Sequence, residues 1–162
     1  MKNFKKSAQH SLKNGTAFTM IELLIVIAIT LLVVGAAIPI YSNLQSQSQS
    51  NSAADQLIQT IRTARERSVA RFNNARHGVC FGTSTYVLYQ GDSYTSRASD
   101  YDRSTKIEPS IVVTLPESFT NNEINFSLSL GIPSATGTIV VNHEVNGSNN
   151  IILNDNGKTE IQ

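Results

Sequence analysis

The sequence predicts an α+β fold in which a long N-terminal helix packs on a C-terminal antiparallel β-sandwich-like head. Three observations support this prediction: an uncharged apolar run over residues 23–40, a helical pattern of apolar residues after it, and alternating apolar residues after Gly78. The 162 residues suffice for one globular domain and one membrane or targeting segment. We therefore expect the helix in two halves, an apolar half followed by an amphipathic half.

The apolar run has the length of a membrane span. As a helix, residues 23–40 would be about 27 Å long, close to the hydrocarbon thickness of a bilayer. A buried helix of a globular domain would show one polar face, whereas this segment is apolar on all sides. We therefore expect residues 18–40 to form a membrane-spanning helix, with a bend or loosened turn at Pro39.

Charge is distributed unevenly along the chain. Of 13 basic residues, four lysines lie among the first 17 residues, which contain no acid. The remaining nine basic and 12 acidic residues give the rest of the chain a formal charge of about −3. The positive-inside rule then places the N-terminus in the cytoplasm and the body outside it. Such a body is not a general nucleic-acid binder by charge alone.

The N-terminal segment is compatible with two kinds of proteolytic processing. A conventional secretory signal would be cut after Gly35-Ala36-Ala37 and release a soluble β-domain that starts at Ile38. The alternative is a cut before the apolar run, which is then retained. Glu22 favours retention, because a carboxylate inside a membrane costs about 2.5–3.5 kcal/mol and usually marks a functional position.

The stretch AFTMIELLIVIAI, residues 17–29, resembles the prepilin signature of type IV pilins and type II secretion pseudopilins. That signature is a short basic leader, a small residue, Phe, Thr, two apolar residues, Glu and a long apolar helix. The resemblance implies a leader of residues 1–17, cleavage between Ala17 and Phe18, N-methylation of Phe18, and pairing of Glu22 with the N-terminal amine of a neighbouring subunit. The family usually has Gly at the position of Ala17, and many pilins have a helix-bending proline at the position of Pro39.

Residues 41–77 predict an amphipathic continuation of the helix. The Ser/Gln repeat of residues 45–50 predicts a polar helical stem just outside the membrane. Asn73-Asn74 and Gly78 are signals that end a helix. Small and apolar residues at spacings of three and four form one stripe that would face the head: Ala54, Leu57, Ile58, Ile61, Ala64, Ser68 and Phe72.

A second resemblance covers much of the remaining chain. Residues 57–81, and GTIVV (137–141) followed by IILNDNGK (151–158), are similar to GspH/FimT-type minor pseudopilins. The resemblance implies a β-rich globular head over residues 78–162 and a minor structural subunit of a secretion pseudopilus or a pilus. It also implies three kinds of partner, which are other pilin subunits, a prepilin peptidase and an inner-membrane assembly platform.

Five arginines between residues 62 and 76 allow two interpretations. Clustered guanidinium groups neutralise phosphates, and some FimT-like pilins bind DNA through a basic C-terminal motif, which here would be GKTEIQ from Gly157. The favoured interpretation is a solvated helix face with local pairs such as Arg62 with Glu66. The candidate nucleic-acid contacts are Arg62, Arg65, Arg67, Arg71, Arg76 and Lys158.

The remainder after Gly78 predicts short antiparallel strands. Asn146-Gly147 and Asn156-Gly157 favour tight hairpin turns, and the polar residues 90–106 lack periodicity and predict a loop that contacts partners. The candidate strands are Val79–Phe81, Thr85–Tyr89, Ile111–Leu115, Glu123–Leu128, Thr138–Asn142, Ile151–Asn154 and Lys158–Ile161.

We expect no catalytic residues, no cofactor and no metal site. His10, His77 and His143 are scattered in the sequence and belong to no recognised catalytic motif. Asp100 and Asp102 form a D-x-D pair without the further oxygen ligands of a calcium loop. Cys80 is the only cysteine, which excludes the disulfide-closed C-terminal loop of major pilins and predicts a small apolar strand residue.

Overall fold

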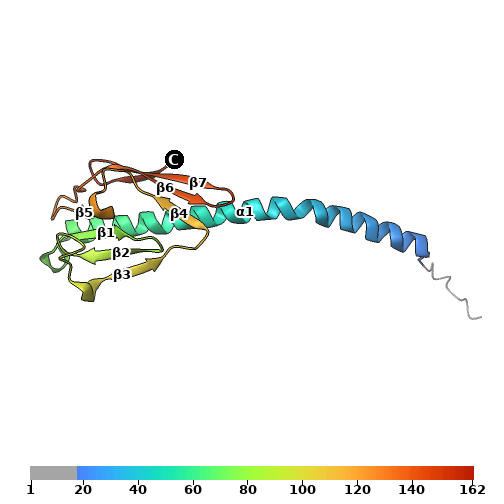
Figure 1. Cartoon of the computed structure of the whole chain (residues 1–162), viewed down its shortest axis with the longest axis horizontal. Helices are drawn as coiled ribbons and strands as arrows, with labels where there is room; N and C mark the ends of the chain where they lie inside the picture. The colour runs from blue at the N-terminus through green and yellow to red at the C-terminus, as the bar shows by residue number, and fades with distance from the viewer. Residues whose placement is uncertain (1–17) are drawn as a thin grey trace, which may run out of the picture. The chain divides into compact units, whose positions relative to one another are not determined.

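A computed structural model describes residues 18–162, and for residues 36–40 it describes the backbone only. The predicted leader, residues 1–17, lies outside the described residues. The chain divides into two compact units with a boundary between Pro39 and Ile40. Helix α1, Met20–Val69, contributes to both units (Figure 1), and the eight strands of the described residues lie in the second unit.

The N-terminus of α1 is capped by Thr19. The side-chain oxygen of Thr19 accepts a hydrogen bond from the backbone N–H of Glu22 at 3.3 Å, and its carbonyl accepts from the N–H of Leu23 at 3.2 Å. These bonds satisfy donors that the first turn of a helix leaves unpaired. Helix α1 therefore begins at Met20, two residues after the predicted start at Phe18.

Within the described part of the chain, no helix is both long and apolar enough to cross a membrane. The predicted span, residues 18–40, includes residues 36–40, whose side chains lie outside the described set. The side chain of Pro39, where a bend is predicted, lies outside it as well.

The second half of α1 buries the predicted stripe. Each of these residues is at most 3% exposed: Ala54, Leu57, Ile58, Ile61, Ala64 and Ser68. Phe72 is the exception, because α1 ends at Val69 and Phe72 is 47% exposed in a short 3-10 helix, η1, Phe72–Asn74. The prediction that the helix extends to residue 77 was therefore wrong.

The early end of α1 has a local cause. Arg71, Asn73 and Asn74 all have φ values between 51° and 53°, in the left-handed region that asparagine tolerates better than most residues. Asn73 and Asn74 therefore have a backbone conformation that cannot continue a helix, as predicted, but α1 already ends at Val69, four residues before Asn73. Strand β1 then begins at His77.

The first sheet contains β1, His77–Phe81; β2, Thr85–Gln90; β3, Arg103–Lys106; and β5, Glu123–Phe126. Its order is β3-β2-β1-β5, and all three pairings are antiparallel. A 3-10 helix, η2, Ser99–Tyr101, precedes β3, and another, η3, Thr120–Asn122, precedes β5.

The second sheet contains β4, Ile111–Thr114; β6, Gly137–His143; β7, Ser148–Leu153; and β8, Thr159–Ile161. Its order is β4-β6-β7-β8, again fully antiparallel. Asn146-Gly147 and Asn156-Gly157 lie in the turns that join β6 to β7 and β7 to β8, as predicted, and both glycines have positive φ.

The second half of α1 packs against both sheets and shares one core with them. Figure 1 shows this part of α1 with β1, β2 and β3 on one side and β6 and β7 on the other. The core joins Leu57 and Ile61 of the helix to Val79 and Ile124 of the first sheet and to Ile139 of the second, with several neighbours. The predicted α+β fold, a long helix packed on antiparallel sheets, is confirmed.

One strand was missed by sequence reasoning. The predicted loop of residues 90–106 contains η2 and strand β3, Arg103–Lys106, so the prediction of a featureless loop was wrong. Strand β3 is an edge strand of polar and charged residues, which gives no alternation of apolar and polar positions to detect. The backbone N–H of Tyr94 donates to Glu123 of β5 at 2.6 Å, which fixes this segment to the sheet, and Arg97 pairs with Asp102 within the segment at 2.7 Å.

Candidate functional site

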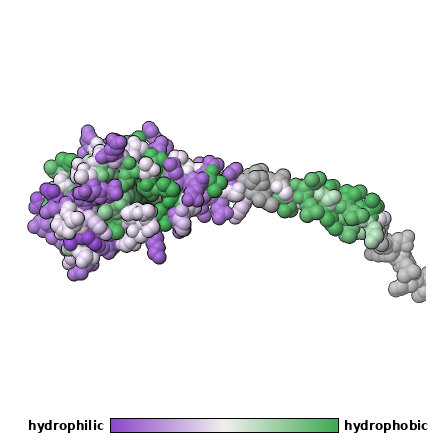
Figure 2. All heavy atoms as spheres, viewed as in Figure 1, coloured by the Kyte–Doolittle hydropathy of each residue, from purple (hydrophilic) through white to green (hydrophobic). Residues whose placement is uncertain are grey.

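The first part of α1 is a rod of exposed apolar side chains. Every described side chain from residue 18 to residue 35 is exposed, and Figure 2 shows this stretch as a continuous hydrophobic surface. Thr30 does not interrupt it, because its hydroxyl donates back to the carbonyls of Val26 and Ile27 at 3.0 and 2.8 Å. A surface of this kind is stable only when lipid or other apolar surfaces cover it.

Glu22 is the only ionisable residue between residues 18 and 35. It occupies the first turn of α1, three residues after the capping Thr19 and four residues after Phe18. A carboxylate in the first turn interacts favourably with the positive end of the helix dipole. The chain supplies no cation within salt-bridge distance of Glu22 among the described residues. Glu22 is thus available to bind an ammonium group from another molecule.

The Ser/Gln repeat of α1 packs directly against the β6–β7 hairpin. Ser46 and Ser50 are 6% and 0% exposed, although the repeat predicted an exposed polar stem. A Cβ added at Gly147 would lie 3.1 Å from the Cβ of Ser50, so hairpin and helix backbones approach closely here. The Ser50 hydroxyl donates to the Val141 carbonyl at 3.3 Å and accepts from Asn149 Nδ2 at 2.9 Å.

Sequence reasoning missed these two serines, although a signal for them exists. Residues 46, 50 and 54 continue the buried stripe of Leu57 and Ile61 toward the N-terminus at four-residue spacing. Serine is small enough to allow close backbone packing, and its hydroxyl satisfies backbone or amide groups of the hairpin. The repeat is therefore part of the head rather than a linker.

The arginines predicted as possible nucleic-acid contacts mostly bind other parts of the chain. Arg62 donates from Nε and Nη2 to the hydroxyl and carbonyl of Thr159 at 3.0 and 3.1 Å, so its predicted pair with Glu66 is not formed. Arg65 donates to the Asn156 carbonyl at 3.2 Å. These bonds attach the C-terminal β7–β8 region to α1.

Only part of the predicted basic set lies together: Arg62, Arg65 and Lys158 line one shallow surface pocket, which also contains Glu66 and Glu160. Arg71 donates to the Ser129 hydroxyl at 2.6 Å, Arg76 lies 3.6 Å from Asp92, and Arg67 lies over the ring of Phe72 at 5.5 Å. Lys158 is exposed next to Gly157. Within residues 18–162, the basic cluster is therefore mainly a set of intramolecular contacts.

The described residues contain no group of three or more His, Cys, Asp or Glu side chains that could hold a metal ion. Asp102 of the D-x-D pair binds Arg97 instead. His143 hydrogen-bonds Gln49 at 3.0 Å, and His10 lies outside the described residues. Cys80 lies in β1, where burial raises the pKa of its thiol and keeps it protonated and unreactive.

His77 is buried without a partner for its ring. It is 1% exposed, and in the part of the chain that the structure describes neither Nδ1 nor Nε2 has a hydrogen-bond partner. Burial lowers the pKa of His77 below its ordinary value of 6.5 and the nearby charge of Arg67 lowers it further, whereas the polar groups of Ala75 and Gln90 act in the opposite direction without cancelling the shift. The folded head therefore holds His77 in its neutral form.

We expect the head to lose stability as the pH falls below about 6.5. The unfolded chain binds a proton at His77 that the folded chain does not, so acid favours unfolding. His77→Phe should remove most of this pH dependence in urea unfolding followed by tyrosine fluorescence between pH 7.5 and 5. The matched control is His143→Gln, a change at a half-buried histidine whose ring nitrogens both have hydrogen-bond partners, and it should leave the dependence intact. Equal dependence in both variants would contradict this role of His77.

Comparison with known proteins yields no relative for this chain. No protein family model, no curated protein and no solved structure matches it.

Proposed function

We propose that this protein is a minor pilin or pseudopilin, a structural subunit of a type II secretion pseudopilus or a type IV pilus. One observation carries the proposal. The side chains of residues 18–35 are all exposed and almost all apolar, and helix α1, which begins within this stretch at Met20, has a single acid in its first turn. A disposable signal sequence needs no such acid, whereas a subunit that packs its helix among copies of that helix can use it.

The proposed life cycle follows from the charge pattern. The four lysines among the first 17 residues keep the N-terminus in the cytoplasm. The chain then resides in the cytoplasmic membrane as a single-pass protein with its body outside. A prepilin peptidase cuts between Ala17 and Phe18, Phe18 is N-methylated, and the assembly platform extracts the helix into the filament.

Glu22 sets the register of assembly in this proposal. The new amine of Phe18 on one subunit neutralises Glu22 of its neighbour in the apolar interior of the filament. A buried charge without a partner is costly, so this pair disfavours any register in which the two groups do not meet. The chain is a mechanical component with no catalytic role, and its head contacts neighbouring subunits or cargo.

The experiment that tests this function is determination of the mature N-terminus of the membrane-associated protein. The proposal requires a chain that begins at Phe18 and keeps the whole apolar helix. It also requires that this processing depend on the prepilin peptidase.

A further inference from the structure

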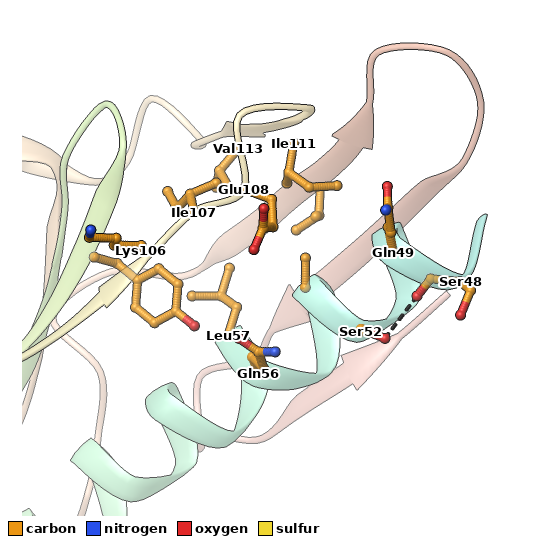
Figure 3. Close-up of a pocket in the computed structure, with 13 residues that line it drawn as sticks. Ser48, Gln49, Ser52, Gln56, Leu57, Lys106, Ile107, Glu108, Ile111 and Val113 are labelled. Carbon is orange, nitrogen blue, oxygen red and sulfur yellow. Dashed lines mark hydrogen bonds between the residues drawn. The ribbon is translucent and has the colours of Figure 1, made fainter. Parts of the chain in front are cut away.

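A groove of about 370 Å³ opens between α1, the end of β3 and strand β4. Figure 3 shows helix residues such as Gln49 and Gln56 on one side of it and the chain from Lys106 to Val113 on the other. The floor is apolar, with Leu57, Ile107, Ile111 and Val113 among its residues, and the rim carries Lys106 and Glu108. All of these residues belong to the second unit.

Strand β4 presents unpaired backbone groups at this groove. The N–H of Glu144 donates to the carbonyl of Ser110, which shows that residue 110 is a hydrogen-bonded position of the β4–β6 ladder. Because such positions alternate in an antiparallel pair, residues 112 and 114 bond to β6, whereas Ile111 and Val113 direct their backbone groups to the free edge. The N–H of Ile111 is used by the Glu108 carbonyl. The Ile111 carbonyl and the Val113 N–H and carbonyl remain for a partner.

The strand edges away from the groove are occupied by the chain itself. At β5, the N–H of Ser134 donates to Asn125 at 2.8 Å, and Pro133 forms a bridge with Phe126. At β8, Arg62 binds the carbonyl of Thr159. These edges therefore cannot accept another strand without breaking existing contacts.

Among the strands of the described residues, only β4 combines an open edge with an apolar, uncharged sequence. Strand β3 also has an open edge, but Arg103 and Lys106 supply the charges that normally prevent pairing with other chains. Strand β4 reads IVVT, has no charge and no proline, and exposes half of Val112. An unprotected edge beside an apolar groove is suited to strand addition.

We propose that this groove binds an extended polypeptide segment from another protein, which adds as a strand to the free edge of β4. The bound segment places apolar side chains at alternate positions over Leu57 and Val113, and polar side chains outward. Glu108 and Lys106 lie at the rim of the groove. The bound segment therefore carries a basic residue that pairs with Glu108 and an acidic residue that pairs with Lys106. A β-branched segment of about five residues fits the length of β4.

The test uses the full-length protein in detergent and a random ten-residue peptide library displayed on phage. We expect selected peptides with alternating apolar residues. Val113→Pro removes the one free N–H of this edge without removing a bond to β6, so it should weaken binding of the synthetic selected peptide at least tenfold in fluorescence anisotropy. The matched control is Ser104→Pro, which places a proline at an outward position of β3 away from the groove and should bind as the wild type does.

A second measurement does not depend on a folded proline variant. In the wild-type complex, hydrogen exchange at the Val113 amide should slow at least tenfold, because the bound strand then accepts its hydrogen bond. Failure to select any peptide, equal binding to Val113→Pro, or unchanged exchange at Val113 would each overturn the proposal. Self-association of the pure protein that Val113→Pro abolishes would overturn it as well, because the occupant would then be a second copy.

Discussion

Glu22→Ala should reduce incorporation of the protein into filaments by at least a hundredfold and leave membrane insertion intact. Insertion should persist, because removing a carboxylate makes an apolar helix easier to insert by about 2.5–3.5 kcal/mol. Assembly should fail, because the amine of Phe18 on the neighbouring subunit would be left buried without a counter-ion.

The size of this effect follows from the cost of breaking a buried ion pair. Removing one partner of such a pair costs about 3–5 kcal/mol. At about 1.4 kcal/mol per factor of ten, that is more than a hundredfold in the equilibrium for each subunit contact. The measurement is quantitative immunoblotting of sheared filaments and of washed membranes from the same cells.

Helix capping is the competing explanation for Glu22, and conservative variants distinguish it from pairing. Glu22 lies at the third helical position after the capping Thr19, where Glu or Gln serves a capping box equally well. If capping were its role, Glu22→Gln would assemble normally. Pairing predicts that Glu22→Gln fails like Glu22→Ala, whereas Glu22→Asp keeps the charge and retains partial assembly. Normal incorporation of the Gln variant would contradict the pairing role.

Ser50→Leu should destabilise the head by about 3 kcal/mol. A larger side chain has no room where Gly147 approaches Ser50, and overpacking of this kind typically costs about 1–3 kcal/mol. The substitution also removes the hydrogen bonds to Val141 and Asn149, although Asn149 keeps its bond to Asn51 at 3.1 Å, and each lost hydrogen bond costs about 1 kcal/mol. Urea unfolding of the full-length protein in detergent, followed by tyrosine fluorescence, measures the free energy of unfolding.

Two further variants separate close packing from hydrogen bonding at this position. Ser50→Ala keeps the small size and removes only the hydroxyl, so it should cost about 1 kcal/mol. Ser48→Leu makes the same enlargement at an exposed serine of the same repeat and should change stability by less than about 0.5 kcal/mol. A Ser50→Leu variant as stable as Ser48→Leu would show that close packing of the repeat against the β6–β7 hairpin does not stabilise the head.

The long-range pattern of the fold could be predicted, because it depends on periodicity. The buried stripe of α1 and seven of the eight strands follow spacings of three to four or of two residues, and the two Asn-Gly pairs fix two turns. Strand β3 could not be predicted, because a polar edge strand is defined by its partner β2 rather than by its own sequence. The end of α1 was misplaced because left-handed geometry at Arg71 is not encoded by that residue type.

A residue of the candidate site could be predicted when its role depends on its neighbours in the sequence. It could not be predicted when its role depends on residues that are distant in the sequence. Glu22 is conspicuous in any reading of the sequence, because it interrupts an apolar run. The roles of Arg62 and Arg65 were not evident, because their acceptors, Thr159 and Asn156, lie more than 90 residues away. The buried position of Ser50 depends in the same way on a distant glycine.

The most direct test of the account is mass spectrometry of the N-terminus of the protein from washed membranes, with and without the prepilin peptidase. A chain that begins at methylated Phe18 only when the peptidase is present is the predicted result. Ala17→Arg is the matched control, because a large charged residue at the cut should leave the leader attached. A mature chain that begins at Ile38 would show that the apolar helix is discarded, and it would contradict the proposed function.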